Sequence, residues 1–242
     1  MGYQHPLVLT SARGVAFVGR RRPRQDRLDP LLRVLVELPD VIDPAAEAPE
    51  GTRWLAPGRV LLEPTLGVVA ERFEAEPATL ALGPSLGERA WRGAHQLAAY
   101  GVSGARPLAW LGAARRARRA PSFWLFEHHD AAPLPLEAPS SRAGRRLAAR
   151  IGDLLRRLHA SGLFHQSPGP DMFALVGGEP IVCAPERLTH AEPTLARRRA
   201  ALAAFATAAP TPRRLVAAAL AAYLRHDAAS VRAAWLDART SR

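Results

Sequence analysis

The chain has 242 residues, 48% of them hydrophobic, and a formal net charge of +11 at pH 7. Its longest apolar run spans residues 215–224, which is shorter than the roughly 20 residues of a membrane-spanning helix. Cys183 is the single cysteine, which excludes an intrachain disulfide and a thiolate zinc cage. The first residues lack the pattern of a signal sequence, so we expect a cytoplasmic protein without a transmembrane segment.

The positive charge comes entirely from arginine, because the sequence contains no lysine. Arginine in place of lysine is typical of a GC-rich genome, so the basic charge is weak evidence for nucleic acid, and we expect no specific nucleic-acid partner. A basic surface would still attract phosphates or an anionic membrane in a salt-dependent way. We interpret the arginine groups as solvated faces or as contacts to the inner membrane: residues 20–22, 115–119, 145–146 and 197–199.

Short strands are predicted for most of the first half of the chain. Their segments are β-branched or apolar and are interrupted by Gly and Pro. These segments are residues 7–20, 59–62, 68–73, 107–111 and 122–126. Residues 39–57 are rich in Pro, Ala and acidic side chains, which predicts a loop.

One helix is predicted within this strand-rich half, at residues 85–100. Its apolar side would carry Trp91, Ala94, Leu97 and Ala98. Gly101 follows directly and is a natural C-terminal cap.

The second half of the chain is predicted to be mostly helical, after a Pro-rich linker at residues 130–139. Ser140 or Ser141 can cap a helix whose apolar residues recur at helical spacing. Those residues are Leu147, Ile151, Leu154, Leu155 and Leu158. Segments 173–176 and 180–183 flank Gly177 and Gly178, which indicates a tight β-hairpin. Three further helices are predicted at residues 195–208, 213–226 and 229–238.

This order of parts resembles a protein-kinase-like fold, and more narrowly the bacterial lipopolysaccharide kinases that act on Kdo and heptose. Residues 158–165, LHASGLFH, match the L-H-x-x-G-x-x-H segment before a kinase catalytic loop. Residues 89–97, RAWRGAHQL, and residues 105–109, ARPLA, are similar to that family's E-W-R-x-x-H-x-L helix and the turn after it. The resemblance covers roughly residues 60–190. It implies an α+β fold with two lobes, a small mixed one at residues 1–128 and a mostly helical one at residues 129–242.

The resemblance also implies that the catalytic and metal-binding groups are missing. The general base would stand two residues after His165, where the chain has Ser167, and the metal-binding Asn would stand at Met172. The metal-binding Asp of the next segment aligns with Ala184. In the small lobe, Glu71 stands where the family has its phosphate-binding Lys, and Ala90 stands where the helix has its Glu, although Glu88 is nearby.

A Gly-rich phosphate loop is also absent, because Gly14 and Gly19 have no glycine between them. Since loss of a general base alone costs about 10²–10⁴-fold in rate, an active enzyme could hardly tolerate all these losses. We therefore expect a pseudokinase without a required cofactor or metal. It would act in cell-envelope assembly by binding a partner protein, a phosphorylated glycolipid or a nucleotide.

Two alternatives remain open. The first is an active ATP-dependent phosphotransferase that uses Asp171 and Glu186 with Mg²⁺ on a lipopolysaccharide-core sugar. The second is an adaptor for anionic membranes or nucleic acid that uses the arginine surface alone. If the chain is not an active phosphotransferase, we expect Glu186 to pair with a nearby arginine and Asp171 to be a solvated turn residue.

The remaining polar residues of the motif are expected to be structural. His159 and His165 would support the loop by packing and hydrogen bonding. Glu127 and His128 would lie at the hinge between the lobes, where a nucleotide base would contact the chain if one binds. His128 and His129 are adjacent and lack an evident third ligand, so we expect no metal there.

Overall fold

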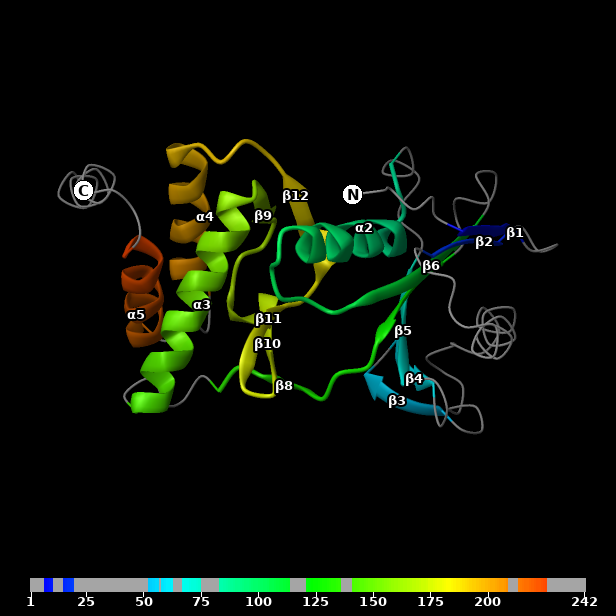
Figure 1. The fold of residues 1–242 in the computed structure, drawn as a ribbon, viewed down its shortest axis with the longest axis horizontal. Coiled ribbons are helices and arrows are strands. Elements are labelled where there is room, and N and C mark those ends of the chain that lie inside the picture. Colours follow the sequence, from blue (N-terminus) through cyan, green and yellow to red (C-terminus); the bar gives the residue numbers. More distant parts are fainter. Residues whose placement is uncertain are drawn as a thin grey trace. The chain divides into compact units, whose positions relative to one another are not determined.

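The computed structural model describes residues 7–10, 15–19, 52–56, 58–62, 67–74, 83–113, 121–135, 141–208 and 213–225. The chain divides into two compact units. The first comprises Met1–Gln96 with Ala105–His129, and the second comprises Leu97–Gly104 with Asp130–Arg242. Figure 1 shows the elements of both. The assignment of these units as the two lobes of a kinase stays a prediction.

Several sequence predictions fall outside the described residues. They are Gly14, the arginine groups at residues 20–22 and 115–119, and the last predicted helix at residues 229–238.

An antiparallel sheet forms most of the described part of the first unit, with strand order β1-β2-β6-β7-β5-β4-β3. The strands are β1 (Leu7–Thr10), β2 (Val15–Gly19), β3 (Thr52–Ala56), β4 (Arg59–Leu62), β5 (Val68–Phe73), β6 (Pro107–Ala113) and β7 (Ser122–Glu127). The predictions for β4 and β5 are confirmed to the residue. Within the predicted segment at residues 7–20, the described residues form two strands, β1 and β2, instead of one. The loop predicted at residues 39–57 is wrong at its end, because Thr52–Ala56 pairs with β4.

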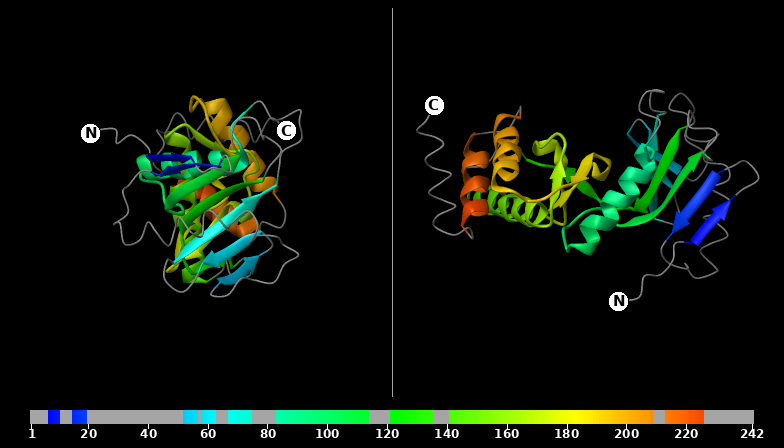
Figure 2. Two further views of the ribbon diagram at one scale, coloured as in Figure 1. Left: turned by 90° about the vertical axis from the view of Figure 1, so that its right-hand side faces the viewer. Right: turned by 90° about the horizontal axis from the view of Figure 1, so that it is seen from above.

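Helix α2 (Leu86–Ala99) lies on this sheet, as Figure 2 shows. Its first turn is held against β7: the Gly87 N–H donates to Ser122 Oγ at 3.0 Å. A Cβ on Gly87 would lie 2.9 Å from the Phe123 carbonyl oxygen, so glycine permits this approach. Ala90 and Ala94 are buried against Trp124. The predicted apolar side is wrong at Ala98, which is exposed.

Gly101 ends α2 as predicted. It has a positive φ of 65°, and its N–H donates to the Ala98 carbonyl at 3.2 Å. The Val102 N–H donates to the Leu97 carbonyl at 2.9 Å. Together these two bonds satisfy the last carbonyls of the helix in a Schellman motif.

The second unit combines three described helices with two small antiparallel sheets. The helices are α3 (Arg142–Ala160), α4 (Leu195–Thr207) and α5 (Arg213–Leu224). One sheet has the order β11-β10-β8, and β9 pairs with β12 in the other. These strands are β8 (Ala131–Pro133), β9 (Leu163–His165), β10 (Phe173–Val176), β11 (Glu179–Val182) and β12 (Leu188–His190). Single 3-10 turns lie at η2 (Pro170–Met172) and η3 (Pro185–Arg187).

The helix and hairpin predicted for this unit are confirmed. Ser141 caps α3, because its side chain accepts the Gly144 N–H at 2.9 Å. Gly177 and Gly178 have φ values of 58° and 81°, which are those of the two central residues of a type I′ turn between β10 and β11. The predicted linker at residues 130–139 is partly wrong, because β8 within it pairs with β10.

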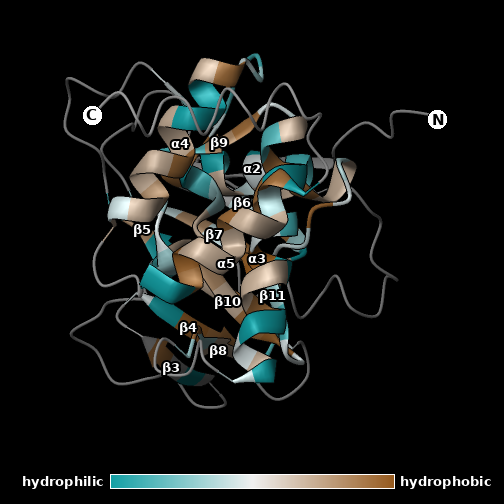
Figure 3. Ribbon diagram, turned by 90° about the vertical axis from the view of Figure 1, so that its left-hand side faces the viewer, coloured by the Kyte–Doolittle hydropathy of each residue, from teal (hydrophilic) through white to brown (hydrophobic). Residues whose placement is uncertain are grey.

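The core of the second unit forms around α3. Four of the five predicted apolar residues of α3, namely Ile151, Leu154, Leu155 and Leu158, are at most 1% exposed, and Leu147 is partly buried against the same cluster. Figure 3, coloured by hydropathy, shows α3 behind α5, with hydrophobic residues on α5, β10 and β11. Among the described helices, none is both long and apolar enough to cross a bilayer.

Candidate functional site

Three residues that the resemblance places at catalytic positions, Ser167, Met172 and Ala184, are brought together in one loop region of the second unit. Strands β9 and β12 pair so that His165 faces Leu188. Beyond them, the Gln166 N–H donates to the Arg187 carbonyl at 2.9 Å, and the Cys183 N–H donates to the Met172 carbonyl at 2.8 Å. These bonds place the loop that contains Ser167 and Met172 beside the segment that begins at Ala184.

His165 holds the turn of this loop. Its ring is 5% exposed, and Nδ1 lies 2.7 Å from the Ser167 carbonyl oxygen, so Nδ1–H is the donor. Burial lowers the pKa of His165 below 6.5, and the positive charge of Arg187 adds to this effect. The hydrogen bond to Ser167 and the charge of Asp171 act in the opposite direction. A mostly neutral imidazole therefore fixes the backbone at Ser167, which is the structural role predicted for it.

The side chains at the base and metal positions offer no carboxylate. Ser167 is exposed, whereas Met172 is 1% exposed and belongs to the hydrophobic core of the unit. Ala184 has only a methyl group. Met172, which the resemblance predicts at a metal-ligand position, thus packs in the hydrophobic core.

The two acidic residues near the loop differ in their surroundings. Asp171 is exposed in η2. The Glu186 side chain is 12% exposed, and its Oε1 lies 3.5 Å from Arg187 Nε. The predicted ion pair of Glu186 with a nearby arginine is therefore confirmed. Within the described ranges, no three His, Cys, Asp or Glu side chains are grouped so that they could hold a metal ion.

Ala184 has a left-handed backbone, with φ 51° and ψ 54°. No other non-glycine residue in the described ranges has a positive φ. This conformation costs about 1–2 kcal/mol for an L-residue, and Asp and Asn tolerate it better than alanine does. The segment keeps it because hydrogen bonds on both sides constrain the backbone: Cys183 N–H to Met172 and Arg187 N–H to the Ala184 carbonyl at 3.0 Å.

Ala184→Gly is expected to stabilise the protein by about 0.5–1 kcal/mol, because relief of the left-handed strain exceeds the entropy that glycine adds to the unfolded chain. Denaturant unfolding measures the change. Ala191→Gly is the control, because Ala191 is not among the residues with positive φ and should be destabilised by the same exchange. If both variants lose stability equally, the strain at Ala184 is not real.

In the first unit, Glu71 is paired with a cation. It lies opposite Arg59 in the β4–β5 register, and Arg59 Nη2 donates to Glu71 Oε1 at 2.6 Å. The Arg59 guanidinium also lies 5.9 Å from the centre of the Phe126 ring. Arg59 on the neighbouring strand thus compensates the negative charge of Glu71, the residue that the resemblance predicts at the lysine position.

The helix position that would hold a kinase glutamate also has a different use. Ala90 is fully buried against Trp124. The nearby Glu88 forms an ion pair with Arg92 one turn along α2, and its backbone N–H donates to Ser85 Oγ. Glu88 is therefore engaged within its own helix.

The backbone donors at the predicted hinge are used within the first unit. The Glu127 N–H donates to the Arg106 carbonyl at 3.0 Å, and the Glu127 carboxylate lies 2.9 Å from Arg106 Nη1. The His128 N–H donates to the Gly67 carbonyl at 2.7 Å. A nucleotide base at Glu127 and His128 would need other donors than these two amides.

His159 belongs to a buried network that sequence reasoning did not find. Its Nδ1 lies 3.0 Å from Tyr223 Oη, and Arg198 Nε donates to the same oxygen at 2.8 Å. Tyr223 Oη thus accepts the Arg198 N–H, and the tyrosine O–H donates to His159 Nδ1. The ring stacks on Phe164 with 4.8 Å between the centroids. Burial, and then the charge of Arg198, lower the pKa of His159 from 6.5 to about 4.

This network joins α3, α4 and α5, and supports the strand that leads to the loop. The structural role predicted for His159 agrees with it. Tyr223 lies 64 residues after His159 and 25 residues after Arg198, and the sequence carried no local signal for these contacts.

The order of these parts defines a kinase-like fold: a sheet with one helix, then a helical unit with the His165 loop and the β10–β11 hairpin. The solved structure of WaaP in complex with acyl carrier protein has a similar fold, with a TM-score of 0.51 and 20% sequence identity. The likeness covers 78% of this chain and 86% of WaaP, and at this identity it shows the fold alone.

Two structures of glucosamine kinase are also similar. One is a second crystal form with a TM-score of 0.45 and 16% identity, and the other is a complex with glucosamine, ADP and inorganic phosphate with a TM-score of 0.43 and 13% identity. Each likeness covers 93% of this chain and 79% of the other. No protein-family model matches the chain, and no curated protein sequence does.

Proposed function

We propose that this chain is a lipopolysaccharide-kinase-like pseudokinase that binds a partner protein or a phosphorylated glycolipid in cell-envelope assembly, at the inner face of the membrane. The observation that carries the proposal is the loop around His165. Its backbone is held by hydrogen bonds to the segment at residues 183–187, yet Ser167, Met172 and Ala184 stand at the positions that the resemblance assigns to the base and the metal ligands. A preserved frame without its reactive groups supports binding over catalysis.

The pairing of Glu71 supports weak nucleotide binding. In an active kinase, a free cation at this position contacts the phosphates. Here Arg59 already pairs with Glu71, so the two charges largely cancel. Neither Met172 nor Ala184 offers an oxygen ligand for Mg²⁺. We therefore propose that ATP and Mg²⁺ are not required cofactors.

The rival is a phosphotransferase that uses Asp171 and Glu186 with Mg²⁺. Asp171 favours it, because this carboxylate is exposed beside the loop. Glu186 disfavours it, because its largely buried side chain is paired with Arg187, which would have to release it before it could bind a metal. Because the rival needs both acids, the ion pair of Glu186 supports the pseudokinase over the phosphotransferase.

A protein partner gains support from the comparison, because WaaP forms a complex with acyl carrier protein. We propose that this chain likewise acts through a partner and not through its own chemistry.

A melting experiment with nucleotide tests the proposal. If the dissociation constant of ATP is millimolar or weaker, 1 mM ATP stabilises the chain by at most about 0.4 kcal/mol, which is about 1–2 °C in Tm. We expect this small shift with and without Mg²⁺. A micromolar affinity that rises with Mg²⁺ would contradict the pseudokinase and favour the rival.

Two variants decide between these outcomes. Asp171→Ala should leave the nucleotide response unchanged if the chain is a pseudokinase, and should abolish the Mg²⁺-dependent part if it is an enzyme. Glu192→Ala removes another exposed acid from the same unit and is the matched control.

A further inference from the structure

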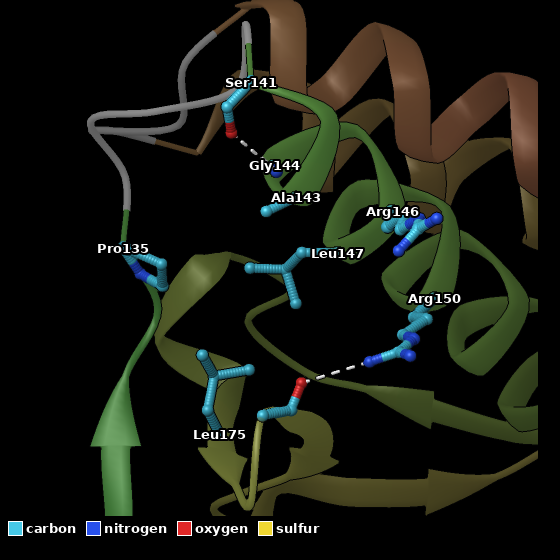
Figure 4. Close-up of a pocket in the computed structure, with 9 residues that line it drawn as sticks. Pro135, Ser141, Ala143, Gly144, Arg146, Leu147, Arg150 and Leu175 are labelled. Atoms are coloured by element: carbon cyan, nitrogen blue, oxygen red, sulfur yellow. Dashed lines mark hydrogen bonds between the residues drawn. The ribbon is translucent and has the colours of Figure 1, made fainter.

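A groove lies beside the first turns of α3. None of its lining residues belongs to the His165 loop. Its volume is about 400 Å³, within the range of roughly 300–1,000 Å³ typical of small-ligand sites. Figure 4 shows its walls, which come from the segment after β8, the start of α3 and the β10–β11 hairpin. The lining residues are Pro135, Ser141, Ala143, Gly144, Arg146, Leu147, Arg150, Leu175 and Gly178.

The groove has a cationic rim. The first nine residues of α3 include four arginines, of which Arg146 and Arg150 line the groove, and the first turn of the helix contains no acid. Arg150 is engaged by Glu179 at 2.7 Å and by the Gly178 carbonyl at 3.3 Å. Arg146 is exposed, and within the described residues no hydrogen bond or ion pair engages it. The rim therefore carries uncompensated positive charge.

Arg142 and Arg145 stand at the start of α3, where a cation disfavours the helix. The N-terminal end of a helix carries a partial positive charge, so acidic residues stabilise it and cations oppose it. A sequence that breaks a local rule without a local gain often does so for binding. An anionic ligand would supply the missing compensation.

The rest of the lining indicates what is attached to the anion. Pro135, Ala143, Leu147 and Leu175 are aliphatic, and the described residues that line the groove include no aromatic ring and no side-chain amide. The Ser141 hydroxyl already caps α3. A sugar ring would find hydrogen-bond donors at the arginines but none along the aliphatic walls, where an aliphatic chain would bury apolar area.

We propose that this groove binds the phosphate and the adjoining aliphatic segment of an anionic membrane lipid, with Arg146 facing the phosphate and Leu147 and Leu175 contacting the chain. The inference deepens the proposed function, on which it rests for the choice of an envelope lipid as the source. It names the lipid-proximal phosphate, and not a saccharide, as the group recognised.

Vesicle binding by the intact chain tests it. The probes are vesicles of phosphatidylcholine with and without phosphatidic acid, at low and moderate salt. Dihexanoyl phosphatidic acid below its micellar concentration and inorganic phosphate serve as competitors. We expect binding to the phosphatidic acid vesicles alone, weakened by salt, and competition by the dihexanoyl lipid at far lower concentration than by phosphate.

Two variants probe the groove. Arg146→Gln and Ala143→Glu should each lower the partition onto anionic vesicles about fivefold, the effect of one charge near a membrane surface. Ala143→Glu should not lower Tm, because an acid in the first turn favours the helix. Arg214→Gln is the control, because it removes an exposed arginine of α5 that does not line the groove.

Three outcomes would overturn the proposal: no binding to anionic vesicles at low salt, equal losses for Arg146→Gln and Arg214→Gln, or competition by phosphate as strong as by the dihexanoyl lipid. The last would show a site for soluble anions. The ATP melting response should be the same in all these variants. A strong Mg²⁺-dependent melting response to ATP would thus contradict the pseudokinase proposal without contradicting lipid binding in the groove.

Discussion

Gly152→Ala is expected to destabilise the second unit by about 1–2 kcal/mol, although alanine is the better helix former. A Cβ on Gly152 would lie 2.1 Å from the Ala219 carbonyl oxygen and 2.9 Å from the Ala222 Cβ, where α3 and α5 meet. The carbonyl is backbone and cannot turn away. Overpacking of this kind typically costs about 1–3 kcal/mol and sometimes more, which exceeds the gain of about 1 kcal/mol in helix propensity.

Denaturant unfolding followed by circular dichroism measures this effect. Ala200→Gly on the exposed face of α4 is the control and should cost about 1 kcal/mol from propensity alone. Gly152→Val should be worse than Gly152→Ala, because its larger side chain meets the same backbone. If Gly152→Ala stabilises the protein, α3 and α5 do not pack as closely as the structure has them.

Acid is expected to destabilise the protein through His159. The pKa of this buried histidine is about 4 in the folded protein and 6.5 in the unfolded chain. Between these values the unfolded chain binds more protons, so the stability present above pH 6.5 is lost as the pH falls towards 4. At about 1.36 kcal/mol per pKa unit, the loss reaches about 3 kcal/mol at pH 4.

The free energy of unfolding, measured between pH 8 and pH 4, tests this prediction. His159→Gln can keep a hydrogen bond to Tyr223 but cannot titrate, so its unfolding free energy should fall much less with acid. Some slope should remain, because burial lowers the pKa of His165 as well. His190→Gln, which removes an exposed histidine of β12, is the control and should keep the wild-type slope. Equal slopes for both variants would show that His159 is not the group responsible.

The groove and loop variants should be combined with these measurements. Neither Arg146→Gln nor Asp171→Ala touches the packing of α3 against α5, so loss of binding in them cannot be attributed to unfolding if the melting curves stay unchanged.

Much of the candidate site could be placed from the sequence, and its electrostatics could not. The resemblance located Ser167, Met172, Ala184 and Glu71, and the structure gathers the first three in one region. The pairing of Arg59 with Glu71 depends on the β4–β5 register. A change of one residue in this register would give every side chain of the two strands a different partner. The burial of Met172 likewise depends on contacts from distant segments.

Local patterns determined the elements whose signals lie within a few neighbouring residues. The heptad-like spacing from Leu147 to Leu158, the Ser141 cap, the Gly101 cap and the Gly177–Gly178 turn each depend on backbone geometry that a short segment sets by itself. The short strands β3, β8, β9 and β12 were missed, because a strand of three to five residues gains its hydrogen bonds from a partner elsewhere in the chain.

Only the tertiary structure shows which distant contacts particular residues make, and so why those residue types are present. A glycine in the middle of α3 looks like a propensity cost in the sequence, and the contact with Ala219 explains it. The sequence predicts a structural role for His159, and the structure alone shows that its partner in the core is Tyr223. The physical reason is the same in both cases: close packing and buried hydrogen bonds depend on which helices meet, and that choice is made by the whole chain.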